Sequence, residues 1–207
     1  MAVTLIYWDI VARATPGYFT AALANIEVKW DSDTANSWPA DKPNAPFGQL
    51  PYLKDGDLKI AQSMAIVRYL GRKGGIQGDD IATYGVGESL IEEAADLINA
   101  VGKAKYSDDP LKAYNEFFES LSTHAANLAK LLKGPFFSGE KALQGDAALY
   151  SAFYLISRLN GEKLSAVLNA EPKLKEWYAA FGKIESIAKA EAALNEKKAY
   201  FTWPEEK

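Results

Sequence analysis

Hydrophobic residues near the start of the chain fall into short β-branched runs separated by one longer amphipathic stretch. Residues 3–7 and 26–30 are two such runs, and we predict that each forms a strand. Residues 13–24 between them predict a helix, in which Pro16 is tolerated because it falls within the first turn. Residues 31–48 then form a polar loop, of a length that is usually either functional or disordered.

A β-hairpin is predicted after this loop. The turn Asp-Gly-Asp at residues 55–57 separates the strand-like residues 50–54 from residues 58–61. Pro51 cannot donate a hydrogen bond to a neighbouring strand, so it marks a strand's first residue, an edge or a turn. A cis bond between Leu50 and Pro51 would turn the backbone of Leu50 outward, where an extended peptide could pair with it. With the first two strands, the hairpin predicts a mixed four-stranded sheet.

A helix is predicted to follow the hairpin. Ser63 is a good N-cap, and Ile66, Tyr69 and Leu70 recur at the spacing of one helical face. The backbone N–H groups after Gln62 therefore lie at a helix start, which attracts carboxylates. Together with the exposed backbone of the hairpin, they predict a site for a short anionic peptide.

The pattern becomes wholly helical in the second half of the chain. Residues 71–87 are rich in glycine, and we place a domain boundary there. Apolar stripes then predict a bundle of helices over residues 88–106, 110–132, 146–160, 171–182 and 184–195. The tail from residue 197 has no helix signals, and its three aromatic residues must cover either the core or a pocket.

Composition excludes several classes of function. The 207 residues include no cysteine, so the chain has no disulfide, thiolate metal site or cysteine nucleophile of its own, and any thiol chemistry needs a thiol from another molecule. The net charge of −4 argues against nucleic-acid binding. The single histidine, His124, shares an apolar stripe with Leu121 and Leu128, which predicts a core histidine and no metal site. With neither a signal pattern nor an apolar run of membrane-spanning length, we expect a cytoplasmic protein that does not enter a membrane.

Three motifs resemble those of a known family. The segment WPADKPNAPFGQLPYL, residues 38–53, resembles the glutathione-binding segment of the tyrosine-type cytosolic glutathione transferases, and its Trp-Pro-x-x-Lys start is most similar to the sigma class. QSMAI, residues 62–66, resembles the helix opening of that family, and LIYWD places Tyr7 at the end of the first strand, as in the family. The resemblance covers most of residues 3–73.

This resemblance implies a two-part architecture. Residues 1–75 would form an α/β thioredoxin-like glutathione-binding domain of order β-α-β-α-β-β-α. Residues 76–86 would form a linker, and residues 87–207 an all-α helical bundle that carries part of an electrophile pocket.

The resemblance also implies roles for individual residues. Tyr7 would donate a hydrogen bond to the glutathione sulfur. Making a thiol of pKa near 8.5 mostly ionised at pH 7 requires about 2.7 kcal/mol, and one charge-assisted hydrogen bond contributes roughly 1.5 to 3 kcal/mol. The expected glutathione-binding residues are Tyr7, Arg13, Trp38, Lys42, Gln49, Leu50, Pro51, Gln62 and Ser63, and the expected walls of the electrophile pocket are Val11, Tyr106 and Phe201.

The family further implies glutathione as co-substrate, no prosthetic group or metal, a small hydrophobic electrophile, and a homodimer with Phe47 at its interface. Two alternatives stay open at this point: glutathione-dependent isomerisation or peroxide reduction, and a non-catalytic ligand-binding or crystallin-like structural role. The chain also departs from the family pattern. Asn99 or Ala100, with Asp96 one turn earlier, stands where a partner subunit's acidic residue is common, and Leu143 replaces a helix-capping Ser or Thr.

Overall fold

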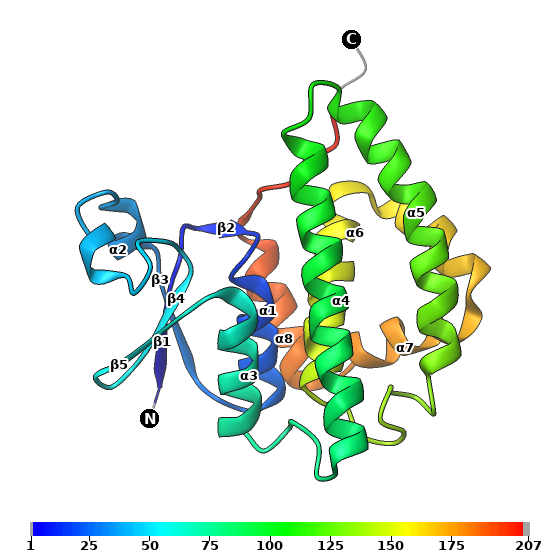
Figure 1. Ribbon diagram of the computed structural model, residues 1–207, viewed down its shortest axis with the longest axis horizontal. Coiled ribbons are helices and arrows are strands. Elements are labelled where there is room, and N and C mark those ends of the chain that lie inside the picture. The colour runs from blue at the N-terminus through cyan, green and yellow to red at the C-terminus, as the bar shows by residue number, and fades with distance from the viewer. Residues whose placement is uncertain (1, 205–207) are drawn as a thin grey trace.

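The computed structural model describes residues 2–204 and contains a four-stranded sheet beside a set of long helices (Figure 1). The elements of the first part are β1 (Val3–Ile6), β2 (Ile10–Val11), α1 (Thr15–Leu23), β3 (Val28–Asp31), α2 (Ser32–Asn36), the 3-10 helix η1 (Lys42–Asn44), β4 (Tyr52–Asp55), β5 (Leu58–Ala61) and α3 (Ser63–Lys73). The sheet order is β3-β1-β4-β5, with β1 parallel to β3 and antiparallel to β4. This mixed sheet confirms the predicted α/β fold of the first part.

Helices make up the second part, as predicted. They are α4 (Ile81–Lys105), α5 (Pro110–Leu131), α6 (Gln144–Ala170), α7 (Pro172–Gly182) and α8 (Glu185–Asn195), and a two-residue strand follows as β6 (Lys198–Ala199). Helix α6 is central, because α1, α4, α5 and α7 all pack against it. Helices α1 and α3 lie between the sheet and the helical part (Figure 1).

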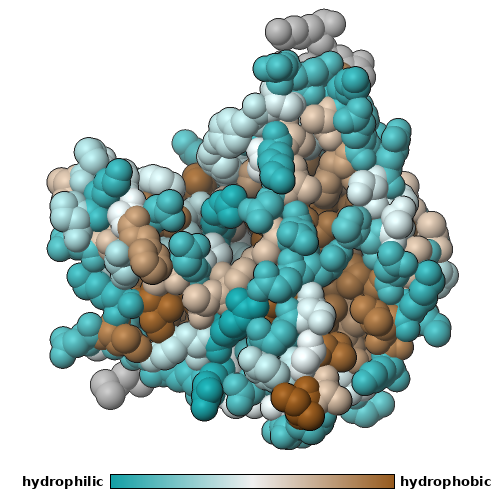
Figure 2. All heavy atoms as spheres, in the orientation of Figure 1, coloured by the Kyte–Doolittle hydropathy of each residue, from teal (hydrophilic) through white to brown (hydrophobic). Residues whose placement is uncertain are grey.

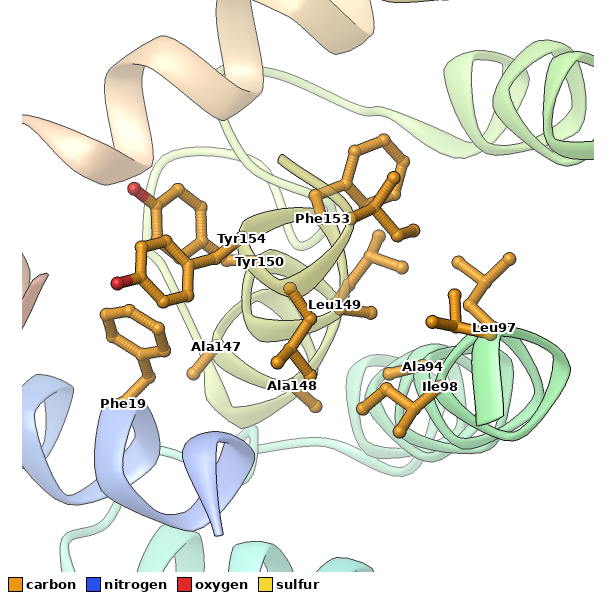
Figure 3. Packing of buried hydrophobic residues seen from close by; sticks show 14 of the residues in the cluster. Phe19, Ala94, Leu97, Ile98, Ala147, Ala148, Leu149, Tyr150, Phe153 and Tyr154 are labelled. Carbon is orange, nitrogen blue, oxygen red and sulfur yellow. The ribbon is translucent and has the colours of Figure 1, made fainter. Parts of the chain in front are cut away.

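The main hydrophobic core joins the two parts through α6. The ring of Phe19 in α1 meets the rings of Tyr150 and Tyr154 edge-on, with centroids 5.2 and 5.3 Å apart (Figure 3). Ala94 and Ile98 of α4 approach the opposite side of α6 (Figure 3). The sheet-bearing part and the helical part therefore share one continuous core.

A second, smaller cluster of buried residues lies on the other face of the sheet. Because successive strand residues point to opposite faces, Leu5 and Leu53 join the main core while their neighbours Ile6 and Tyr52 join the small cluster. The five buried members of this small cluster are Ile6, Ala35, Ala45, Tyr52 and Ala61. The segment that carries α2 and η1 thus covers this face.

Two local expectations in the first part were wrong. The loop at residues 31–48 is not irregular throughout, because it contains α2 and η1, and the Asp31 side chain caps α2 by accepting the Thr34 N–H at 2.9 Å. Ser63 is the first helical residue of α3 rather than its N-cap. Gln62 occupies the cap position, with a φ of 74° and no side-chain hydrogen bond to the helix.

Two helix boundaries in the second part also differ from expectation. Helix α4 begins at Ile81, inside the stretch that we predicted as linker. Helix α6 does not end at Asn160, because the chain resumes helical geometry after a break at that residue. Asn160 ends the first helical run with an extended φ of −158°, and its side chain accepts the backbone N–H of Lys163, as an N-cap does, so that a second run starts at once.

Candidate functional site

A cleft of about 1090 Å³ opens where the sheet-bearing part meets α4, α5 and the tail. Figure 2 shows the molecule hollowed between the sheet-bearing part on the left and the helical part on the upper right. Ten of the residues singled out from the sequence line this cleft: Tyr7, Arg13, Trp38, Gln49, Leu50, Pro51, Gln62, Ser63, Tyr106 and Phe201. Residues from four separate stretches of the chain are therefore brought to one cavity.

Two of the expected residues do not line the cleft. Val11 is 1% exposed and points into the core, while its neighbours Ile10 and Ala12 contribute to the wall instead. Val11 lies in β2, which pairs with the tail, so its side chain turns away from the cavity. Lys42 is exposed, and its side-chain carbons lie against Gly48, which does line the cleft.

Tyr7 follows β1 and lines the cleft from a buried position, and its hydroxyl oxygen has one hydrogen-bond partner within the described residues. That oxygen accepts the backbone N–H of Arg13 at 3.3 Å, and the ring packs against Trp8 and Trp30. Burial raises the pKa of Tyr7 to about 12. The hydroxyl therefore stays protonated at neutral pH, and because the Arg13 N–H occupies a lone pair, the hydroxyl proton is directed toward another acceptor.

Residues 50–51 and 62–63 line the same cleft and have unusual backbone geometry. The Leu50-Pro51 peptide bond is cis, as is Trp38-Pro39. Gln62 has a φ in the left-handed region, which residues other than glycine rarely adopt and which is found often at functional sites. Ser63, which lines the cleft, begins the eleven-residue helix α3, and the N–H groups of the first turn have no partners in the helix itself.

The tail forms one wall of the cleft, of which only Phe201 was assigned to the pocket from the sequence. Its aromatic residues were expected to cover core or pocket, and Tyr200 and Phe201 do line the cleft. The hydroxyls of Tyr200 and Tyr106 are hydrogen-bonded, and Lys105 donates to the Tyr200 carbonyl at 2.6 Å. Since β6 also pairs with β2, the tail is held both by β2 and by Lys105 and Tyr106 at the end of α4.

The remaining wall comes from α4 and α5 and combines polar with apolar residues. His124 is not the core histidine that we predicted, because its side chain is 38% exposed and its Nδ1 lies 2.5 Å from Oε1 of Glu93. Helix α5 turns Leu121 and Leu128 into the core and leaves His124 at the margin of that stripe, facing the cleft. The other cleft residues absent from the expected site set are Trp8, Asp96, Leu97, Asn99, Ala100, Gly102, Lys103, Phe117 and Ser120.

Comparison with known proteins agrees with this geometry. Residues 3–72 match the family described as glutathione S-transferase, N-terminal domain. Glutathione S-transferase Mu 6 of Mus musculus is 30% identical over 203 residues, which cover 91% of this chain and 89% of that protein. The chain belongs to the glutathione transferase family. Glutathione S-transferase 2 of Manduca sexta is 42% identical over 72 residues, a span of 35% of this chain and 36% of the relative.

Solved structures show the same fold for this transferase. The glutathione S-transferase Blo t 8 aligns with a TM-score of 0.83 at 21% identity, over 94% of both chains. The glutathione S-transferase of Ascaris lumbricoides aligns with a TM-score of 0.79 at 23% identity, over 97% of this chain and all of that one. Within residues 2–204, no helix has the length and apolar character needed to cross a membrane, and no cluster of three or more metal-ligating side chains is found.

Proposed function

We propose that this transferase binds glutathione in the cleft and that Tyr7 stabilises its thiolate for attack on a small hydrophobic electrophile. The observation that carries the proposal is that Tyr7 lines the same cavity as residues 49–51 and 62–63. Its pKa of about 12 keeps it a donor, and its bond from Arg13 directs the proton toward the cavity.

Each part of glutathione finds complementary groups around the cavity. The γ-glutamyl carboxylate would bind Gln62 and the N–H groups at the start of α3, beginning with Ser63. The cysteinyl backbone would pair with the backbone of Leu50. The cis peptide bond between Leu50 and Pro51 lies directly before β4. The glycyl carboxylate would accept from Trp38, which lines the cleft, and from Lys42, which is exposed and lies against the cleft residue Gly48.

Tyr7 alone can supply the energy that ionisation needs. Lowering the pKa of a bound thiol by roughly two units corresponds to about 2.7 kcal/mol, within the 1.5 to 3 kcal/mol of one hydrogen bond to a charged group. Arg13 also lines the cleft and adds positive charge to its wall. The electrophile would occupy the space between Tyr7, Tyr106 and Phe201, where proximity adds to thiolate activation.

Membership in the sigma class, a cytoplasmic location and a homodimer are part of the same proposal. The class rests on the Trp38-Pro39 and Lys42 start of the glutathione segment. The dimer rests on Phe47, a large apolar side chain that is 67% exposed in the single chain. A partner subunit that covers Phe47 would remove this surface from water.

The test compares the wild type with Tyr7→Phe by retention on immobilised glutathione and by the pH dependence of conjugation. We expect both proteins to be retained, because the hydroxyl contacts only the sulfur. In the wild type the rate should rise with pH as the bound thiol ionises. In Tyr7→Phe the midpoint should move up by about two units, from roughly 6.5 to 8.5, which lowers the rate near pH 7 roughly 25-fold.

Tyr18→Phe is the matched control, because Tyr18 packs against Trp30 from outside the cleft. It should bind and turn over glutathione as the wild type does. Equal turnover by Tyr7→Phe and the wild type would refute the role of Tyr7. Failure of the wild type to bind glutathione would refute the proposed function as a whole.

Glutathione-dependent isomerisation is the second candidate. It is favoured by the similarity to hematopoietic prostaglandin D synthase of Gallus gallus, which is 28% identical over 151 residues and matches 72% of this chain and 74% of that protein. The same thiolate would serve both reactions. Turnover that regenerates glutathione instead of consuming it would favour isomerisation.

A further inference from the structure

The segment that brings Trp38 to the cleft does not rest on the main core. It spans residues 31–48 and lies on the far face of the sheet, against the small cluster of five buried residues described above. Trp38 packs on this cluster and also lines the cleft. A segment that depends on so few apolar contacts has low local stability, so single polar contacts matter more to its position.

Side-chain hydrogen bonds tie this segment to the sheet. Lys59 of β5 donates to the Asn44 carbonyl at 3.0 Å from an exposed position, whereas the bond from β4 comes from a buried side chain. Tyr52 in β4 is fully buried, and its hydroxyl donates to Oδ2 of Asp41 at 2.8 Å. The other carboxylate oxygen of Asp41 accepts the side-chain amide of Asn44 at 2.9 Å. Asp41 precedes η1, which starts at Lys42, and follows Trp38 by three residues. The bond therefore fixes the stretch between the two groups expected at the glycyl carboxylate.

We propose that Tyr52 and Asp41 are positioning residues for glutathione binding. The inference rests on the proposed function and adds to it two residues that do not line the cleft. The Tyr52 hydroxyl, held by the sheet, selects the conformation in which Trp38 and Lys42 face the ligand. Without it, the competent conformation is a smaller fraction of the population, and the apparent dissociation constant rises by the inverse of that fraction.

The effect should be confined to glutathione binding. Tyr7 belongs to the main core, and its backbone N–H donates to the carbonyl of Asp31, the last residue of β3, ten positions before Asp41. Loss of the Tyr52–Asp41 bond should therefore leave the groups that stabilise the thiolate in place. Tyr52→Phe removes only the oxygen and keeps the buried ring. Because a hydrogen bond to a charged group is a strong one, we expect the KM for glutathione to rise about ten-fold with kcat unchanged.

The chain contains a matched control with the same chemistry. The Tyr69 hydroxyl donates to Oδ2 of Asp55 at 2.6 Å and joins α3 to the end of β4, and neither residue lines the cleft. Tyr69→Phe deletes an equivalent bond elsewhere in the same part of the protein. It should leave the KM for glutathione within two-fold of the wild type.

Variants of Asp41 distinguish the loss of the hydrogen-bond acceptor from the loss of the negative charge. Asp41→Asn keeps an oxygen that can accept from Tyr52, so its KM for glutathione should stay close to that of the wild type. Asp41→Ala removes the acceptor of the Tyr52 hydroxyl. Asp41→Ala also removes the acceptor of the Asn44 amide, so its KM should be at least that of Tyr52→Phe. Because both variants lose the Tyr52–Asp41 bond, the double variant should be no worse than Asp41→Ala alone.

The experiment measures initial rates against glutathione concentration at saturating electrophile, together with hydrogen exchange of the backbone amides. Tyr52→Phe should raise the KM, leave kcat unchanged and speed exchange only within residues 31–48. An unchanged KM in Tyr52→Phe overturns the inference, as does an equal rise in Tyr69→Phe, which would indicate a general loss of stability. A wild type that neither binds nor turns over glutathione refutes the proposed function itself, a result separate from these.

Discussion

Removing the carboxylate of Asp146 should be among the most destabilising single changes in this protein. Asp146 lies in the first turn of α6 and is 1% exposed. Its Oδ1 accepts the indole N–H of Trp177 at 2.9 Å and the backbone N–H of Phe137 at 3.2 Å, and its Oδ2 accepts the backbone N–H of Leu143 at 3.0 Å. One side chain thus joins α6, α7 and the loop before α6.

The magnitude follows from the donors that Asp146→Ala leaves behind. Trp177 and Phe137 are both 1% exposed, so water cannot replace the lost acceptor at either N–H. Each buried donor without a partner costs about 1 to 3 kcal/mol, and the change should therefore lower the free energy of unfolding by about 4 kcal/mol. A typical domain has only about 5 to 15 kcal/mol in total.

The assay is equilibrium unfolding in urea followed by tryptophan fluorescence, in two backgrounds. In Trp177→Phe the indole donor is already absent, so Asp146→Ala should cost about 1 to 3 kcal/mol less there than in the wild type. An Asp146→Ala cost below about 1 kcal/mol, or the same cost in both backgrounds, would refute the reasoning that unsatisfied donors carry the loss.

Local patterns in the sequence were sufficient for the sheet and the helices but not for the boundary between the two parts. Glycines near residue 85 led us to predict a linker, whereas α4 is helical from Ile81. Helix α4 packs along α6, and at one point the two backbones are close: a Cβ at Gly145 of α6 would lie 2.8 Å from the Cα of Gly87. A Cβ at Gly85 or Gly87 would meet nothing closer than 3.9 Å, so it is the α6 side of this contact that requires glycine. Composition alone does not show whether packing will hold a glycine-rich stretch in a helix.

The two sides of the site also differed in how well the sequence predicted them. Residues 49–51 and 62–63 belong to two motifs that are close in the sequence, and the structure brings them to one cavity with Tyr7. The Tyr106–Tyr200 hydrogen bond joins residues 94 positions apart, and β2 and β6 are strands of only two residues. Contacts between such distant and short stretches leave no periodic signal, so Tyr200 and His124 could not be assigned to the cleft from sequence.

Two further changes test how the elements are held together, each by urea unfolding. Gly145→Ala should lower the free energy of unfolding by about 1 to 3 kcal/mol, because its Cβ meets the backbone of Gly87. A Cβ at Gly161 in the same helix meets nothing within 4 Å, so Gly161→Ala should be neutral or stabilising. Equal effects of the two changes would refute the packing argument. Lys197 pairs with Asp9 and also lies 4.6 Å from the centre of the Trp30 ring. Asp9 is 60% exposed at its side chain, so the ion pair alone contributes about 0.2 to 1 kcal/mol, while the cation over the ring adds about 0.5 to 1 kcal/mol. Lys197→Gln removes both contacts and should therefore cost more than Asp9→Asn, which leaves the cation on the ring; the reverse order would show that the ring contributes nothing to holding the tail.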